Sequence, residues 1–184
     1  GGASLIKKAK GYEFSLQVPD STKYFVAAIV DRKKVIDNNN NTGYDMFLNH
    51  SKPANMGNCI LERILLISYA SKSMASKLNL KLDSSSESML AEYNKLFEKY
   101  PKMKEDKCYE NYLYHKAASN SNKEEVKSEM LAFAKKCEKK NSEGYQLVAS
   151  RLYGHLKMTD EKKRLEEQVK VKYPKGDLAA SNFF

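Results

Sequence analysis

The three cysteines are the residues of this chain most able to do chemistry, because a thiolate can attack a substrate, bind a metal or form a disulfide. Cys59, Cys108 and Cys137 are widely spaced and form no Cys-x-x-Cys pair. Each lies on the apolar side of a predicted helix, where a free cysteine packs as a small hydrophobe. Burial is therefore the favoured interpretation. A disulfide between Cys108 and Cys137 is the alternative, because these residues lie on consecutive antiparallel helices.

An asparagine-rich segment could imitate a calcium loop. Asp37, Asn39 and Asn41 place oxygen atoms at alternate positions, as calcium-binding loops do. However, the glutamate that such a loop needs at its twelfth position is replaced by Leu48. Asparagine also tolerates left-handed backbone and caps its own turns. We therefore predict a rigid hairpin loop and no metal site.

No set of catalytic residues accompanies these side chains. The histidines are isolated in the sequence, at His50, His115 and His155. A nucleophile with a base and an orienting group, a phosphate-binding loop and metal-ligand spacing are all missing. We therefore expect no catalytic residue, no cofactor and no enzyme activity within this chain.

The positive charge of the chain is spread rather than concentrated. The 184 residues carry a net charge of +9, with 12 basic and 7 acidic residues in positions 1–83 and 20 and 16 in positions 84–184. No nucleic-acid-binding motif accompanies this charge, so we predict a solvated surface and no nucleic-acid partner. No apolar run reaches the roughly 20 residues that span a bilayer, so we expect no transmembrane segment.

The first part of the chain, residues 1–54, reads as a small antiparallel β region. Residues 12–18 alternate apolar and polar side chains, which predicts a half-buried strand. Apolar residues at 23–30, 35–36 and 44–48 predict further strands of a short meander. Because so few strands do not form a stable sheet alone, we expect them to pack on the helices or on missing sequence.

The second part, residues 55–184, has a helical pattern. A stretch at 56–74 is apolar around most of its circumference, which predicts a buried helix. Helix pairs then follow, with capping-box spacing at Ser84 and Glu87 and again at Ser121 and Glu124. The predicted pairs are 86–100 with 103–118, 121–137 with a helix starting near 142, and 159–173 with a helix starting at 177.

These pairs recur with a period. Tyr100 and Tyr173 each precede a proline, and Cys137 stands at the same phase between them, 37 residues after Tyr100 and 36 before Tyr173. This period is close to that of tetratricopeptide repeats. We therefore predict an α+β, mostly α, fold with tetratricopeptide-like helical hairpins. Because the third pair has only eleven residues after Tyr173, we expect the array to be truncated at its C-terminal end.

Tyrosines on the second helices form a candidate protein-binding face. Tyrosine supplies amphipathic anchors at interfaces, and the candidates are Tyr109, Tyr112, Tyr145 and Tyr153. Core packing is the alternative for these side chains, because they recur at helical spacing.

Three short stretches complete the sequence evidence. They read Tyr-Glu-Phe-Ser-Leu-Gln-Val-Pro at 12–19, Val-Ile-Asp-Asn-Asn at 35–39 followed by Gly43-Tyr44, and Lys-Tyr-Pro-Lys-Gly-Asp-Leu-Ala at 172–179. Together they resemble the N-terminal region of TlpA-type thiol:disulfide oxidoreductases of Gram-negative envelopes, in which a β region and helical repeats precede a thioredoxin-like domain. The resemblance implies a location in the periplasm or cell envelope.

The resemblance carries no catalytic residue to this chain, because the reactive Cys-x-x-Cys of that family is missing. We therefore expect a non-catalytic accessory module that binds a protein or peptide or holds an attached thioredoxin-like domain. The alternative is a free-standing tetratricopeptide-like adaptor without a redox role.

Overall fold

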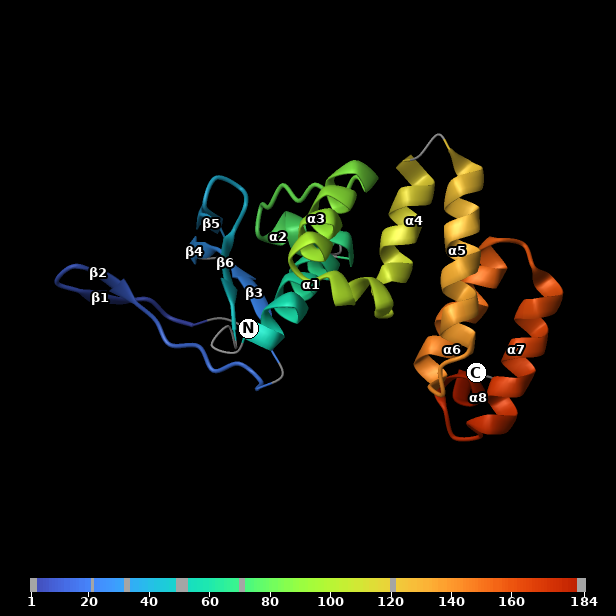
Figure 1. Ribbon diagram of the computed structural model, residues 1–184. Coiled ribbons are helices and arrows are strands. Elements are labelled where there is room, and N and C mark those ends of the chain that lie inside the picture. The colour runs from blue at the N-terminus through green and yellow to red at the C-terminus, as the bar shows by residue number, and fades with distance from the viewer. Residues whose placement is uncertain are drawn as a thin grey trace. The chain divides into compact units, whose positions relative to one another are not determined.

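The computed structural model describes residues 3–20, 22–31, 34–48, 53–69, 72–119 and 122–181. It confirms the predicted α+β, mostly α, fold, with small antiparallel strand pairs followed by helices (Figure 1). The chain packs as two units. The N-terminal unit comprises Gly1–Arg63 and Ser71–Lys81, and the helical unit comprises Ile64–Ala70 and Leu82–Phe184. The first division between the two units lies within the helix over residues 53–69.

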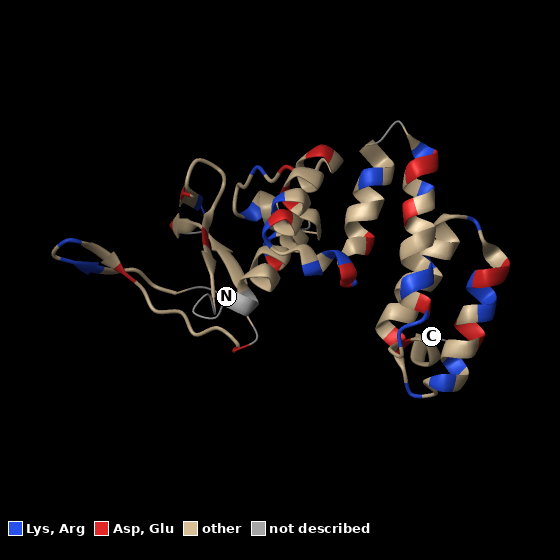
Figure 2. Cartoon of the chain, in the orientation of Figure 1, with Lys and Arg blue, Asp and Glu red and all other residues tan. Residues whose placement is uncertain are grey.

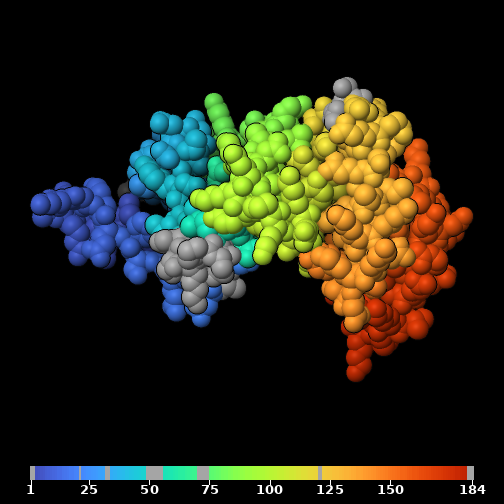
Figure 3. All heavy atoms as spheres, in the orientation of Figure 1, coloured from blue at the N-terminus to red at the C-terminus, as the bar shows by residue number. Residues whose placement is uncertain are grey.

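The first hairpin is exposed. Within the described residues, strands β1 (Ile6–Lys8) and β2 (Gly11–Glu13) pair only with each other, and all of their residues are exposed (Figure 3). The predicted half-buried strand over 12–18 is wrong beyond Glu13, and the Tyr12 side chain is 68% exposed. A segment with alternating apolar and polar side chains forms a strand only when another strand is available to hydrogen-bond with it. The strand that follows in sequence, at residues 24–27, pairs with residues 44–47 instead.

The remaining strands form two antiparallel pairs. Strand β3 (Tyr24–Ala27) pairs with β6 (Tyr44–Phe47), and β4 (Ile29–Asp31) pairs with β5 (Lys34–Asp37). The predicted meander is therefore replaced by a nested arrangement, in which the outer strands β3 and β6 pair with each other. The asparagine-rich segment is an insertion between β5 and β6 rather than a hairpin loop, because these two strands are not paired.

This insertion is held by its own side chains and by the segment after α2. Asn39, Asn40 and Asn41 all have positive φ angles, which asparagine tolerates better than most residues. The Asn38 side-chain amide donates to the carbonyls of Leu78 at 3.2 Å and Asn79 at 2.6 Å. The asparagines therefore fix a loop conformation and its attachment to the chain.

Gly43 closes the insertion and should tolerate no side chain. Its φ is +80°, and an added Cβ would collide with Val26 and lie 3.3 Å from Leu80 Cδ2. We predict that Gly43→Ala destabilises the N-terminal unit by about 2 kcal/mol, through left-handed backbone strain and displaced apolar side chains. Urea unfolding would measure this loss. The control is Gly11→Ala, which also has positive φ but open space around it. An equal loss in both variants would contradict the packing argument.

The predicted helix over 56–74 consists of two helices. Helix α1 (Pro53–Tyr69) is followed by α2 (Lys72–Lys77). Cys59 and Ile64 of α1 are fully buried, whereas Tyr69 is exposed. The N-terminal strands pack on α1 as expected: Lys23 pairs with Glu62 at 3.4 Å, and the Cys59 thiol donates to the Leu48 carbonyl at 3.1 Å.

The helix pairs follow the predicted order. They are α3 (Ser86–Lys99) with α4 (Tyr109–Ser119), α5 (Lys123–Glu138) with α6 (Glu143–His155), and α7 (Thr159–Lys172) with α8 (Asp177–Ala180). The second helix was predicted from residue 103 but begins at Tyr109. A 3-10 turn, η1 (Pro101–Glu105), precedes it, because a proline directly after a helix forces a new chain direction.

The helix starts also differ by one residue from the prediction. Ser85 caps α3 by accepting from the Ser88 backbone N–H, rather than Ser84. Asn122 caps α5, because its side-chain oxygen accepts from the Glu125 backbone N–H. The predicted cap, Ser121, lies outside the described residues. Asparagine and serine cap equally well because both place an oxygen near the free N–H groups.

The repeat is visible in the backbone of its turns. The N–H of the third residue after each anchor donates to the anchor's carbonyl: Met103 to Tyr100 at 3.0 Å, Lys140 to Cys137 at 3.1 Å and Gly176 to Tyr173 at 2.9 Å. The Tyr100 and Tyr173 caps have nearly the same φ and ψ, −132° and 69° against −124° and 68°. The turns after Tyr100 and Tyr173 are therefore equivalent. The turn after Cys137 shares their hydrogen bond, but Cys137 lies within α5, whose C-cap is Lys139.

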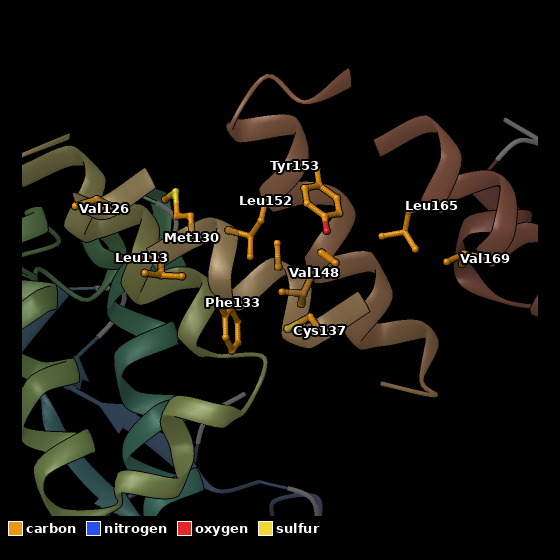
Figure 4. Close-up of a cluster of buried hydrophobic side chains, with 12 residues drawn as sticks. Leu113, Val126, Met130, Phe133, Cys137, Val148, Leu152, Tyr153, Leu165 and Val169 are labelled. Atoms are coloured by element: carbon orange, nitrogen blue, oxygen red, sulfur yellow. The ribbon is translucent and has the colours of Figure 1, made fainter. Parts of the chain in front are cut away.

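One apolar cluster runs through the helical unit, with α6 between α5 and α7 (Figure 4). Leu113 comes from α4, and the predicted face of α5 is buried. Figure 4 labels the larger side chains of this cluster, namely Leu113, Val126, Met130, Phe133, Cys137, Val148, Leu152, Tyr153, Leu165 and Val169. A continuous core across repeats is what stacked helical hairpins require.

Candidate functional site

The thiols are buried and unreactive. Cys59, Cys108 and Cys137 are all free and buried, so the alternative of a Cys108–Cys137 disulfide is not realised in this structure. Burial raises the pKa of the Cys108 thiol to about 12 and that of Cys137 to about 11. Both thiols are therefore protonated at neutral pH, and a protonated thiol is a poor nucleophile and a poor metal ligand.

The histidines do not gather into a site. His115 is half-buried, which lowers the pKa of its imidazole, and its Nδ1 lies 3.5 Å from the Ser86 hydroxyl. His155 is exposed and its ring lies 5.2 Å from that of Tyr114. His50 lies outside the described residues. Within the described part of the chain, no three His, Cys, Asp or Glu side chains are placed to hold a metal ion.

Two of the four candidate tyrosines lie together. The rings of Tyr109 and Tyr112 stack with centroids 5.2 Å apart, and both contact Phe97. Tyr109 also packs on Phe133, and its hydroxyl donates to the Glu129 carboxylate. These half-buried rings join α3, α4 and α5, so much of their surface is already used for packing.

The other two candidates have different surroundings. Tyr145 is partly buried, with the Lys140 ammonium 3.7 Å from its ring centroid. Tyr153 is only 2% exposed, and its hydroxyl donates to Glu138 Oε2 at 2.5 Å. Tyr153 is therefore a core residue and cannot contact a partner in this structure, as the packing alternative anticipated.

Ion pairs between helices were not visible in the sequence. The Arg151 guanidinium on α6 binds the Glu110 carboxylate on α4 through two parallel hydrogen bonds, Nε–Oε1 at 2.7 Å and Nη2–Oε2 at 2.5 Å. Arg164 on α7 binds Glu138 on α5 at 2.6 Å. The partners of these two pairs are 41 and 26 residues apart in sequence. Ion pairs can be predicted from sequence only when the partners are three or four residues apart on one helix.

Glu129 is held ionised by its neighbours. Burial acts to raise its pKa, but hydrogen bonds from the Lys116 ammonium at 2.6 Å and from Tyr109 outweigh it, so the pKa is lowered. A carboxyl whose pKa is lowered by folding stabilises the folded state above its unfolded pKa, and this contribution is lost as pH falls through the folded pKa.

We therefore predict that the helical unit loses stability between about pH 5 and pH 3, and that Glu129→Gln makes this loss smaller. The free energy of unfolding in urea, measured across that range, would test the prediction. Glu124→Gln on the same helix is the control, because Glu124 is exposed and pairs only with Lys127. If Glu129→Gln leaves the pH dependence as steep as in the parent chain, the assignment to Glu129 is wrong.

Comparisons with protein-family models, curated proteins and solved structures find no match for this chain. Among the helices that the structure describes, none has the length and apolar content to cross a membrane.

Proposed function

We propose that this chain is a non-catalytic helical-repeat module that binds or spaces protein, and that it forms the accessory N-terminal part of an envelope thiol:disulfide oxidoreductase. The observation that carries the scaffold assignment is the one apolar cluster through the stacked helices, together with the hydrogen bond that recurs at the turns after Tyr100, Cys137 and Tyr173. Stacked repeats of this kind offer extended surfaces to other polypeptides. The redox context rests on the resemblance of the sequence to TlpA-type proteins.

The surroundings of the thiols support a non-catalytic role. A disulfide oxidoreductase needs a thiolate that solvent can reach, whereas Cys108 and Cys137 are buried with raised pKa values. A free-standing adaptor is the second candidate, because the helix pairs need no redox partner to pack.

Insulin reduction in the presence of dithiothreitol tests the proposal, with Cys59→Ser/Cys108→Ser/Cys137→Ser as the control. We expect equal rates with the parent chain, with the triple variant and without protein. Faster reduction by the parent chain alone would contradict a non-catalytic role. Reading the coding sequence after Phe184 separates the two candidates: a thioredoxin-like segment with Cys-x-x-Cys favours the accessory module, and a stop codon favours the adaptor.

A further inference from the structure

A pair of lysines recurs at each of the turns that follow the anchors Tyr100, Cys137 and Tyr173. One lysine stands directly before the anchor residue and one stands two positions after it. The six residues are Lys99 and Lys102, Lys136 and Lys139, and Lys172 and Lys175. The spacing of 37 and 36 residues is visible in the sequence, and the hydrogen bond that recurs after each anchor places the three pairs at corresponding turns of the helical unit. We call these six residues the lysine row.

The lysine row lies at one end of the stacked helices. α3 and α7 end one residue before their anchors and α5 ends one residue after Cys137, and Figure 2 shows basic residues near the lower ends of α5 and α7. All six side chains are exposed. In the described part of the chain, none of the six forms an ion pair with an acidic side chain, whereas Lys95, Lys116, Lys127 and Lys162 do so.

Nearby acidic groups are used elsewhere. Glu138 binds Arg164 and the Tyr153 hydroxyl, and the Glu143 carboxylate accepts from the Leu178 backbone N–H at the start of α8. Glu98 and Glu105 are exposed beside the first turn, and Asp177 is exposed beside the third, so they offset part of the charge. The six lysines of the row still outnumber these three carboxylates.

The helix dipole explains only part of this pattern. Cations are favoured in the last turn of a helix, and the effect falls off beyond it. It accounts for Lys99, Lys136 and Lys172. Lys102 and Lys175 follow the C-cap residues of their helices and lie outside this range, and Lys139 is itself the C-cap.

We propose that the lysine row binds an acidic polypeptide segment in extended conformation, an inference that rests on the proposed protein-binding function and names its partner class. Packed helices lie about 8–10 Å apart, and an extended chain advances about 3.3 Å per residue. Because α4 and α6 lie between the three helices of the row, two such spacings, about 16–20 Å, separate successive lysine pairs. An acidic side chain at about every fifth or sixth residue of an extended segment would therefore stay in step with the row.

An acidic polypeptide fits this surface better than a nucleic acid. Arginine forks and free aromatic faces are the usual means of holding phosphates and bases. Here Arg151 and Arg164 are committed to internal carboxylates. The rings of Tyr100 and Tyr173 are half-buried, with the ammonium groups of Lys99 and Lys172 within 5.8 Å and 5.5 Å of their centroids.

The test uses a fluorescent peptide of about twelve residues with the repeat Glu-Glu-Ser, titrated with the full chain at low salt. We expect Lys102→Gln/Lys139→Gln/Lys175→Gln to weaken binding about tenfold, from the modest contribution of each exposed ion pair. The matched control, Lys123→Gln/Lys157→Gln/Lys163→Gln, removes the same charge from exposed lysines of the same unit and should change binding less than about twofold.

Three results would overturn the proposal: no binding by the parent chain, equal weakening by both triple variants, or tighter binding of a single-stranded oligonucleotide or of vesicles containing phosphatidylglycerol. The first shows that the row does not recognise an acidic peptide. The second leaves net charge alone as the explanation, and the third assigns the row to another partner. None of them touches the proposed non-catalytic role, which fails only if the chain itself reduces insulin.

Discussion

Replacing Leu152 by alanine should destabilise the helical unit by about 3 kcal/mol, the largest loss that we expect from a single substitution in this chain. Leu152 is fully buried on α6, which packs between α5 and α7 (Figure 4). Alanine would lose the transfer free energy of the removed carbons and leave a cavity that three surrounding helices cannot easily close. Urea unfolding followed by far-ultraviolet circular dichroism would measure the loss.

Two further variants separate cavity formation from other effects. Leu152→Met keeps the volume and should cost less than about 1.5 kcal/mol. Val171→Ala, on the exposed side of α7, should change stability by less than about 0.5 kcal/mol. If Leu152→Ala costs no more than Val171→Ala, then the core does not run through α6 as the structure has it.

Local sequence signals predicted the helical unit well. The ends of α3 and α7 at Tyr100 and Tyr173 follow from the prolines behind them, because proline cannot continue a helix. The buried face of α5, including Met130 and Phe133, follows from its period of 3.6 residues. Both signals act within a few residues, so they do not depend on the rest of the fold.

Features that depend on distant partners were missed. The alternation over 12–18 is a true local pattern, but β3 pairs with β6 and leaves that segment without an edge. Tyr153 was offered as a binding residue, yet neighbouring helices enclose it and Glu138 satisfies its hydroxyl. The lysine row was missed for another reason. Lysines are common at the C-terminal ends of helices, so each pair taken alone indicates only a solvated helix end, although the sequence already aligned the anchors beside them.

Removing the Arg151 side chain should be the most damaging change to an ion pair of the helical unit. The Glu110 carboxylate, on a residue that is 5% exposed, accepts two hydrogen bonds from Arg151 and one from the Tyr114 hydroxyl at 2.9 Å. Arg151→Ala leaves this buried charge with Tyr114 alone. Loss of one partner of a buried pair costs several kcal/mol. Because the Arg151 side chain is itself 54% exposed, solvent screening reduces the expected loss to about 2 kcal/mol.

The comparison with Arg164→Ala shows whether burial of the carboxylate decides the cost. Arg164 pairs with Glu138, whose side chain is more accessible than that of Glu110, so its removal should cost less than about 1 kcal/mol. Replacing both charged partners, in Glu110→Leu/Arg151→Met, should recover most of the stability lost in Arg151→Ala, because no unpaired charge then remains buried. Urea unfolding of the four chains measures each step. Equal losses for Arg151→Ala and Arg164→Ala would mean that water reaches Glu110. The pair would then contribute no more to the stacking of α4 and α6 than an ordinary surface ion pair does.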